Sequence, residues 1–223
     1  KIESTFIGHP LLEEKSKSKV DISQVIKDNK KLFSIYPGSR LSEINILMPI
    51  LFEFVKKMNY KHRDLFFVFH STAEHVQLIQ NLLLKEGLKN CGAIADEKIK
   101  THVLQSSIFA VAKSGTISLE ICNAKIPSVI IYKMGAINFF ILKMLVKVRF
   151  ANIINIAANE EIIPELLQSN CNSTKIFETV DKLLSDKIKL ENQLTKTQLI
   201  IRNFKTKRST ETASSVLTHF LES

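Results

Sequence analysis

The sequence has no tryptophan and only three cysteines among its 223 residues. Cys91, Cys122 and Cys171 are far apart and include no Cys-x-x-Cys pair, so neither a disulfide framework nor a zinc site is indicated. A reducing compartment such as the cytoplasm fits this cysteine usage best. No segment reaches the roughly 18 uninterrupted apolar residues that a membrane-spanning helix needs, and we therefore expect any membrane contact to be peripheral.

Many familiar catalytic signatures are missing as well. The sequence contains no Walker loop, no Gly-x-Gly-x-x-Gly fingerprint and no Ser-His-Asp arrangement. It also has no cluster of metal ligands and no Asp-x-Asp pair that would hold a metal on a diphosphate. We therefore expect a metal-independent mechanism without a cofactor.

Positive charge, in contrast, is abundant. The formal net charge is +9 and the isoelectric point is near 9.4, which indicates an anionic partner such as a nucleotide, a phosphorylated substrate, an acidic membrane or a nucleic acid. Charge alone does not choose among them. Nucleic acid is disfavoured because the basic residues lie in an early segment and in the tail, without interleaved aromatic side chains for base stacking.

Short apolar segments alternate with amphipathic ones along most of the chain. We expect strands at residues 32–36, 65–70, 93–95, 108–112 and 128–132, and helices at 41–58, 73–85, 98–106 and 117–124. Ser39 or Ser42 is available to cap the first helix. Because parallel strands need crossovers that are usually helical, this order predicts an α/β fold: a Rossmann-like parallel sheet of five to six strands with helices on both faces.

From residue 160 onward the pattern predicts only helix, at 160–168, at 173–185 and from about 187 to the end. We accordingly divide the chain into a basic interdomain segment at 1–31, a Rossmann-like domain at 32–186 and a C-terminal helical tail at 187–223.

Two turns after expected strands are suited to bind phosphate, since ligands of open parallel sheets lie beyond the carboxyl ends of the strands. Gly38 allows close backbone approach, Ser39 offers a hydroxyl and Arg40 offers a forked cation. The second turn has the same ingredients, with Lys113, Ser114, Gly115 and Thr116. For each turn the alternative is an ordinary connection between a strand and a helix, because glycine and serine are common in turns.

Other candidate residues are polar groups near the expected strand ends. Glu120 follows Thr116 by one helical turn and is placed to accept hydrogen bonds from ribose hydroxyls, unless it is a solvated helix residue. Asn155, in the irregular run 152–155, and Glu165 with Gln168, spaced on one helical face, are candidates for contacts to a sugar. His9, in a Gly-His-Pro turn, is a candidate for the cleft because of its near-neutral pKa, although an isolated histidine of this kind is more often structural.

The segment Ala136–Val148 is apolar nearly all round and is flanked by lysines and an arginine. It fits a buried helix, and equally an interfacial helix in anionic lipid headgroups, since it is too short to span a bilayer.

Taken in order, these segments resemble the C-terminal half of lipid-A-disaccharide synthases, which are inverting glycosyltransferases of the GT-B type. The resemblance covers about residues 6–185 and rests on Phe6–Leu11, Tyr36–Arg40 with Glu43, Lys113–Glu120, Pro127–Lys133, Leu145–Lys147, Asn155 and Pro164–Gln168.

The resemblance implies that a whole enzyme has two Rossmann-like domains and that this chain supplies the second, sugar-nucleotide-binding one. The implied reaction transfers 2,3-diacylglucosamine from UDP-2,3-diacylglucosamine to 2,3-diacylglucosamine 1-phosphate. The implied place is the inner face of the inner membrane. The two turns would face the diphosphate, Glu120 the ribose, and Asn155, Glu165 and Gln168 the rest of the donor cleft. Arg40 would stabilise charge on the leaving UDP.

Two departures from the family qualify this expectation. The family's N-terminal domain, with the presumed aspartate base and much of the acceptor site, is absent, so we expect the isolated chain to be inactive. Ile154 stands where the family commonly has proline, which affects the local loop only. Residues 187–223 are then exposed, or pair with a second copy in a homodimer.

Two alternatives stay open at this point. One is another GT-B protein, such as an N-acetylglucosaminyltransferase or a UDP-sugar epimerase, which shares the donor fold but not the lipid acceptor. The other is a non-catalytic, basic nucleotide- or nucleic-acid-binding module.

Overall fold

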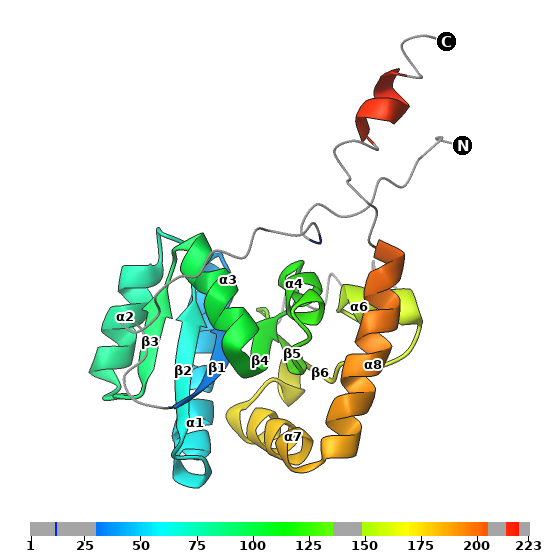
Figure 1. Cartoon of the computed structure of the whole chain (residues 1–223). Coiled ribbons are helices and arrows are strands. Elements are labelled where there is room, and N and C mark those ends of the chain that lie inside the picture. Colours follow the sequence, from blue (N-terminus) through cyan, green and yellow to red (C-terminus); the bar gives the residue numbers. More distant parts are fainter. Residues whose placement is uncertain (1–11, 13–29, 136–148, 205–212, 219–223) are drawn as a thin grey trace.

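A computed structural model describes residue 12 and residues 30–135, 149–204 and 213–218 (Figure 1). Three of the sequence predictions lie outside these residues: the turn around His9, the basic segment before residue 30, and the apolar segment 136–148.

The centre of the fold is a single six-stranded parallel sheet with the strand order β3-β2-β1-β4-β5-β6 (Figure 1). Its strands are β1 (Lys31–Tyr36), β2 (Leu65–His70), β3 (Cys91–Ile94), β4 (Ser107–Lys113), β5 (Ser128–Tyr132) and β6 (Glu165–Leu167). The first strand, β1, lies in the middle of the sheet. β2 and β3 follow on one side of it, and β4, β5 and β6 follow on the other side. The direction of winding therefore reverses between β1 and β4, and a ligand crevice is expected at the carboxyl ends of these two strands.

Helices cover both faces of the sheet, which confirms the predicted fold class. They are α1 (Leu41–Lys61), α2 (Val76–Lys85), α3 (Glu97–Ser106), α4 (Ile117–Asn123), α6 (Ile153–Ala158), α7 (Ser173–Ser185) and α8 (Lys187–Phe204). Side chains of α1, α2 and α7 share one buried cluster with alternate strand residues. Those of α3, α4, α6 and α8 pack on the opposite face, as the period-two alternation of strands requires.

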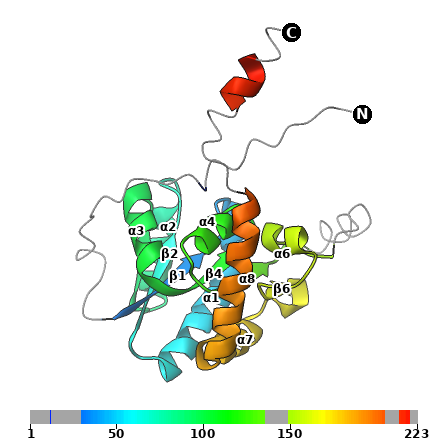
Figure 2. The same ribbon diagram turned by 45° about the vertical axis from the view of Figure 1, so that its right-hand side comes forward.

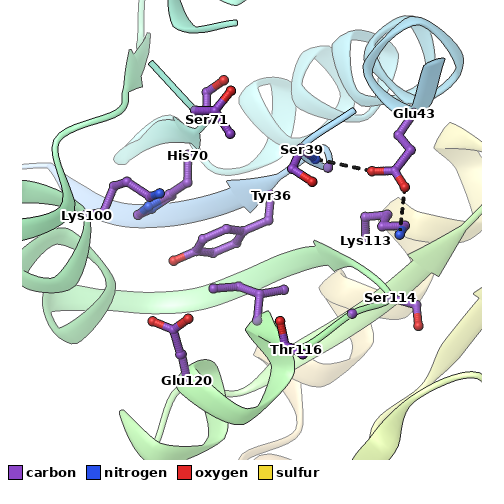
Figure 3. A pocket seen from close by; sticks show the side chains of 14 residues that line it. Tyr36, Ser39, Glu43, His70, Ser71, Lys100, Lys113, Ser114, Thr116 and Glu120 are labelled. Carbon is purple, nitrogen blue, oxygen red and sulfur yellow. Dashed lines mark hydrogen bonds and ion pairs between the residues drawn. The ribbon is translucent and has the colours of Figure 1, made fainter. Parts of the chain in front are cut away.

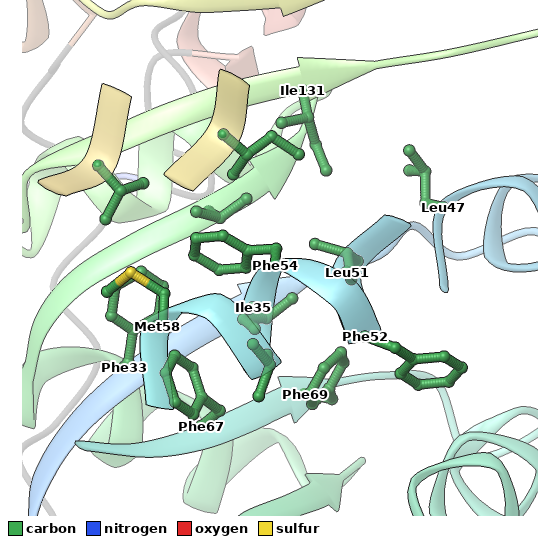
Figure 4. Close-up of a cluster of buried hydrophobic side chains, with 14 of the residues drawn as sticks. Phe33, Ile35, Leu47, Leu51, Phe52, Phe54, Met58, Phe67, Phe69 and Ile131 are labelled. Atoms are coloured by element: carbon green, nitrogen blue, oxygen red, sulfur yellow. The ribbon is translucent and has the colours of Figure 1, made fainter. Parts of the chain in front are cut away.

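The larger core is built around aromatic rings from neighbouring strands (Figure 4). The Phe33 ring on β1 lies 5.2 Å from Phe67 on β2, 5.5 Å from Phe109 on β4 and 5.9 Å from Phe54 on α1. All four side chains are fully buried. The cluster fixes α1 against the central strands, and α1 begins at the edge of the expected crevice.

The prediction of a helix at 160–168 is wrong. Glu165–Leu167 forms the edge strand β6, which pairs in parallel with Ile130–Tyr132, and a single 3-10 turn (Gln168–Asn170) follows it. A strand of three residues is too short to show its own alternation, so its pairing with β5 decides its structure. Glu165 and Gln168 therefore do not share a helical face.

Two local predictions are also wrong. The run 152–155 is not irregular, because Asn152 caps helix α6 by accepting a hydrogen bond from the Ile154 N–H at 2.8 Å. The first helix is not capped by Ser39 or Ser42, since the N-cap is Arg40 and the side chain of Glu43 takes the nearby backbone N–H groups.

Helix α8 lies against α4, α6 and α7 and closes one face of the sheet (Figure 2). Its residues Gln193, Thr197 and Ile201 are buried. The Gln193 amide accepts a hydrogen bond from the Ser128 N–H at 2.8 Å and donates one to the Ser128 carbonyl at 3.0 Å. Residues 187–204 of the predicted tail are thus packed on the sheet domain rather than exposed.

We expect Gln193→Ala to lower the free energy of unfolding by about 1–3 kcal/mol, because it leaves both buried backbone groups of Ser128 without a partner. Urea titration followed by circular dichroism measures this loss. The matched control is Gln77→Ala on α2. The exposed amide of Gln77 donates a hydrogen bond to the Asn81 side chain, and its loss should change the free energy of unfolding by less than about 0.5 kcal/mol. Equal stability of the two variants would show that α8 does not hold β5.

Candidate functional site

A pocket of about 320 Å³ opens at the carboxyl ends of β1, β2 and β4 (Figure 3). It lies where the strand order reverses, as expected for an open parallel sheet. The first turns of α1, α3 and α4 also contribute to it, through Glu43, Lys100 and Glu120 respectively.

The pocket brings together seven of the residues that the sequence singled out: Gly38, Ser39, Lys113, Ser114, Gly115, Thr116 and Glu120. They come from two turns that are far apart in the sequence and adjacent in the sheet. Arg40 follows the first turn but does not line the pocket, and its side chain is 80% exposed.

The carboxylate of Glu43 joins these two turns. It accepts hydrogen bonds from the backbone N–H groups of Ser39 at 3.2 Å and Arg40 at 3.4 Å. Its other oxygen lies 2.9 Å from the Lys113 ammonium, and both side chains are largely buried. The first turn, the start of α1 and the end of β4 are therefore held by one charged group.

Gly38 is required by the same arrangement. Its φ of +112° lies in a region that side chains rarely adopt, and a Cβ added there would approach Glu43 Oε2 to 2.5 Å. Only glycine allows the turn to pass this close to the carboxylate.

The pKa of Glu43 is lowered from its ordinary value. Partial burial raises it, but the hydrogen bond and the charge of Lys113, with the N–H groups of Arg40 and Ser39, outweigh that effect. The carboxylate is therefore ionised at neutral pH. Because the folded pKa lies below the unfolded one, the resulting stabilisation is present above the unfolded pKa and is lost as the pH falls through the folded pKa.

The second turn is supported by a different network. The Ser114 hydroxyl donates to the Ala151 carbonyl at 2.7 Å. The Glu165 carboxylate accepts from the N–H groups of Ala151 at 2.7 Å and Asn152 at 2.9 Å, and from the Asn155 amide at 2.8 Å. Glu165 thus fixes the segment whose carbonyl orients Ser114.

Both the oxygen and the nitrogen of the Asn155 side-chain amide form hydrogen bonds within the protein. Its oxygen accepts from the N–H groups of Ile162 at 2.9 Å and Ile163 at 3.0 Å, and its nitrogen also donates to the Ile163 carbonyl at 2.7 Å. Neither Asn155 nor Glu165 lines the pocket. Their predicted contact with a donor sugar stays a prediction, whereas the structure shows them supporting the second turn.

Gln168 lies beyond the pocket, just after β6. Its side-chain oxygen accepts from the Met134 N–H at 3.2 Å, and its φ of +51° is unusual for a residue with a side chain. The amide nitrogen of Gln168 is buried without a hydrogen-bond partner in the described part of the chain.

Sequence reasoning missed half of the pocket: Tyr36, Glu43, His70, Ser71, Thr72, Lys100 and Ile117 also line it. The available signal was that His70 ends a buried strand and that Ser71 and Thr72 follow it, so these polar residues reach the same edge of the sheet. The residues after this strand include no glycine, so they do not resemble a phosphate-binding turn.

Both pocket lysines have carboxylate partners, since Lys113 pairs with Glu43 and Lys100 with Glu97 at 2.8 Å. An anion bound here would therefore also depend on backbone N–H groups at the starts of α1 and α4, which lack partners within the helix. In the turns, the N–H groups of Ser39, Arg40 and Ser114 already donate to protein oxygens. In the described ranges, no three His, Cys, Asp or Glu side chains gather as metal ligands would. Within the same ranges, no helix is both long and apolar enough to cross a bilayer.

The fold defines the class of protein: a doubly wound α/β domain similar to one half of a GT-B glycosyltransferase. The solved structure of S. aureus MnaA with UDP superimposes with a TM-score of 0.62 at 16% identity, over 94% of this chain and 50% of that one. WaaG, a glycosyltransferase involved in lipopolysaccharide biosynthesis, gives 0.57 at 12% identity, over 88% and 49%. At such low identity these likenesses establish the fold alone.

Sequence comparison identifies the family. The profile of lipid-A-disaccharide synthetases matches residues 1–219. The lipid-A-disaccharide synthase of Sulfurihydrogenibium sp. is 30% identical over all of this chain and 60% of its own length, and that of Rickettsia typhi is 31% identical over 92% and 54%. The chain belongs to the lipid-A-disaccharide synthetase family, which confirms the resemblance, and it spans only about half to 60% of these relatives.

We expect Glu43→Gln to lower the free energy of unfolding at pH 7 by about 1.5–3 kcal/mol, because a charged acceptor of several hydrogen bonds is lost. The difference from the unsubstituted chain should shrink as the pH falls below about 4.5, the ordinary pKa of this carboxyl, and should be lost as the pH falls through the lower pKa of the folded state. Urea titrations at several pH values measure it.

Glu53→Gln is the control for this experiment. Glu53 lies on the same helix, and its carboxylate pairs with Lys56 on the exposed surface, where such a pair contributes little. A difference between Glu43→Gln and the unsubstituted chain that did not change with pH would contradict the role of the Glu43 charge.

Proposed function

We propose that this chain is the donor-binding part of a lipid-A-disaccharide synthase. It binds UDP-2,3-diacylglucosamine, whose sugar is transferred to 2,3-diacylglucosamine 1-phosphate to give the β-1,6-linked disaccharide and UDP. The observation that carries this proposal is the pocket lined by two turns at strand ends, which Glu43 and Lys113 join, in a chain of this family.

In the proposed complex the diphosphate lies between the turn at Gly38–Ser39 and the turn at Ser114–Thr116. The two turns lead into α1 and α4, and N–H groups at a helix start favour an anion. The N–H groups of Ser39 and Arg40 already donate to Glu43. Glu120 lines the same pocket one helical turn further along α4 and is placed to accept hydrogen bonds from ribose hydroxyls.

Arg40 has a separate proposed role. Its side chain is 80% exposed and its guanidinium is 3.8 Å from the Glu43 carboxylate, so it can turn toward a bound diphosphate. A permanent cation there stabilises the negative charge that grows on UDP as the bond breaks.

The transfer itself needs one proton acceptor. A hydroxyl oxygen of the acceptor attacks the anomeric carbon, the bond from that carbon to UDP breaks, and its electron pair leaves with UDP. A base takes the hydroxyl proton. We propose that this base belongs to the part of the full-length relatives that the chain does not span, and that the mechanism uses neither a metal nor a cofactor.

We further propose that the assembled enzyme acts peripherally at the inner face of the inner membrane, where both lipid substrates reside, and that it forms a homodimer. The net charge of +9 supports attraction to anionic headgroups.

UDP should bind the chain, and Arg40→Ala should weaken that binding about tenfold or more, because a charge-assisted contact to phosphate is lost. Isothermal titration calorimetry measures the affinity. Arg202→Ala, which removes an arginine from the last turn of α8, away from the pocket, is the matched control and should bind UDP like the unsubstituted chain. Unchanged affinity of Arg40→Ala would remove Arg40 from the site.

The isolated chain should form no disaccharide from the two lipid substrates, because the proposed base lies elsewhere. Thin-layer chromatography of radiolabelled product measures turnover. Disaccharide formation would show that the base is in this chain.

Tight, salt-dependent RNA binding without any thermal shift by UDP would overturn the transferase proposal altogether.

A further inference from the structure

The end of β2 is a second polar region of the pocket. His70, Ser71 and Thr72 line it. Figure 3 shows His70 on the opposite side of Tyr36 from Glu43 and Lys113. His70 and Ser71 are 3% and 4% exposed. The Tyr36 ring stacks on the imidazole with the ring centres 4.1 Å apart.

Each of these three consecutive residues carries a buried polar atom that has no hydrogen-bond partner: His70 Nδ1, Ser71 Oγ and Thr72 Oγ1. The described residues contain only two other such side-chain atoms. An unpartnered buried polar atom costs about 1–3 kcal/mol, and native structures retain few of them without a reason. Three in a row at a pocket wall indicate groups that a ligand satisfies.

The hydrogen bonds beneath the pocket determine which nitrogen of His70 carries the proton. The Ser107 hydroxyl donates to the Val103 carbonyl at 2.8 Å. The Ser34 and Ser107 oxygens are 2.7 Å apart, so the hydrogen between them comes from Ser34. His70 Nε2, which is 2.9 Å from the Ser34 oxygen, must then be the donor.

His70 Nδ1 is consequently a lone-pair acceptor on a neutral ring. Burial, and to a smaller extent the charge of Lys100, lowers the pKa of His70 to about 3, so the ring stays neutral at physiological pH. A neutral acceptor repels a phosphate oxygen, since no hydrogen lies between the two lone pairs, and it attracts an N–H or O–H group.

We propose that His70, Ser71 and Thr72 form a neutral subsite that binds an N–H or O–H group from an uncharged part of the donor, while the two turns bind its diphosphate. This inference rests on the proposed function. In a UDP-sugar, such groups belong either to the nucleoside or to the sugar. The three atoms are buried while their residues line the pocket, so contact with a ligand requires these side chains to rotate.

The test uses Thr72→Val and Ser71→Ala in the full 223-residue chain. Removing a hydroxyl that has no partner should raise the melting temperature by roughly 2–4 °C. The same change should weaken binding of the donor about three- to tenfold. The matched control is Thr197→Val, because the Thr197 hydroxyl on α8 is also buried but donates to the Leu194 carbonyl; it should lose stability and keep its affinity.

Calorimetry with pyrophosphate, UDP and UDP-N-acetylglucosamine then locates the bound group. Weaker UDP binding with unchanged pyrophosphate binding assigns the subsite to the nucleoside. Unchanged UDP binding with weaker UDP-N-acetylglucosamine binding assigns it to the sugar. Unchanged affinity for all three, or an equal loss for pyrophosphate, overturns the subsite. If the unsubstituted chain binds none of the three, the proposed function itself fails.

Nitrogen-15 NMR of histidine-labelled protein gives an independent readout, with His70→Gln to assign the signal. A free Nδ1 should resonate as an unprotonated nitrogen and should shift when UDP or UDP-N-acetylglucosamine donates a hydrogen bond. A protonated Nδ1, or a signal that neither ligand moves, would overturn the proposal.

Discussion

The pocket depends above all on the contact between the Glu43 carboxylate and the Lys113 ammonium. It joins the turn after β1 to the end of β4, at the point where the direction of winding reverses. The same carboxylate holds two N–H groups of the first turn and leaves no room for a side chain at Gly38. Because Lys113 is already paired, an incoming anion has to compete with Glu43 for it or rely on backbone N–H groups, and both options favour a ligand that fits the turns closely.

The pocket divides into two electrostatically different halves. Glu43, Lys113 and the two turns form a charged and strongly hydrogen-bonding half. On the other side of Tyr36, burial keeps His70 neutral, and the hydroxyl of Ser34 is 2.9 Å from its Nε2. A ligand with one anionic part and one neutral, hydrogen-bonding part matches this division, and a nucleotide sugar is such a ligand.

Support for the pocket comes from residues that do not touch it. Glu165 and Asn155 hold the segment whose carbonyl orients Ser114, and Gln193 on α8 holds the start of β5. These polar groups were predicted to meet a sugar or to lie in an exposed tail. A sequence pattern shows that a polar residue is present, but not whether its partner is a ligand or the backbone of a distant segment.

The parallel α/β class, five of the six strands, and the two turns with glycine and serine at strand ends could be predicted from the sequence. These features depend on local hydrophobic periodicity and turn chemistry. The family could also be recognised from the order of short motifs. Three features became visible only in the folded chain: the strand Glu165–Leu167, the contact of Glu43 with Lys113, and the position of a neutral His70 in the pocket. Each of these features depends on which strands become neighbours in the sheet. Neighbouring strands are far apart in the chain, so no local sequence pattern specifies which residues will be in contact.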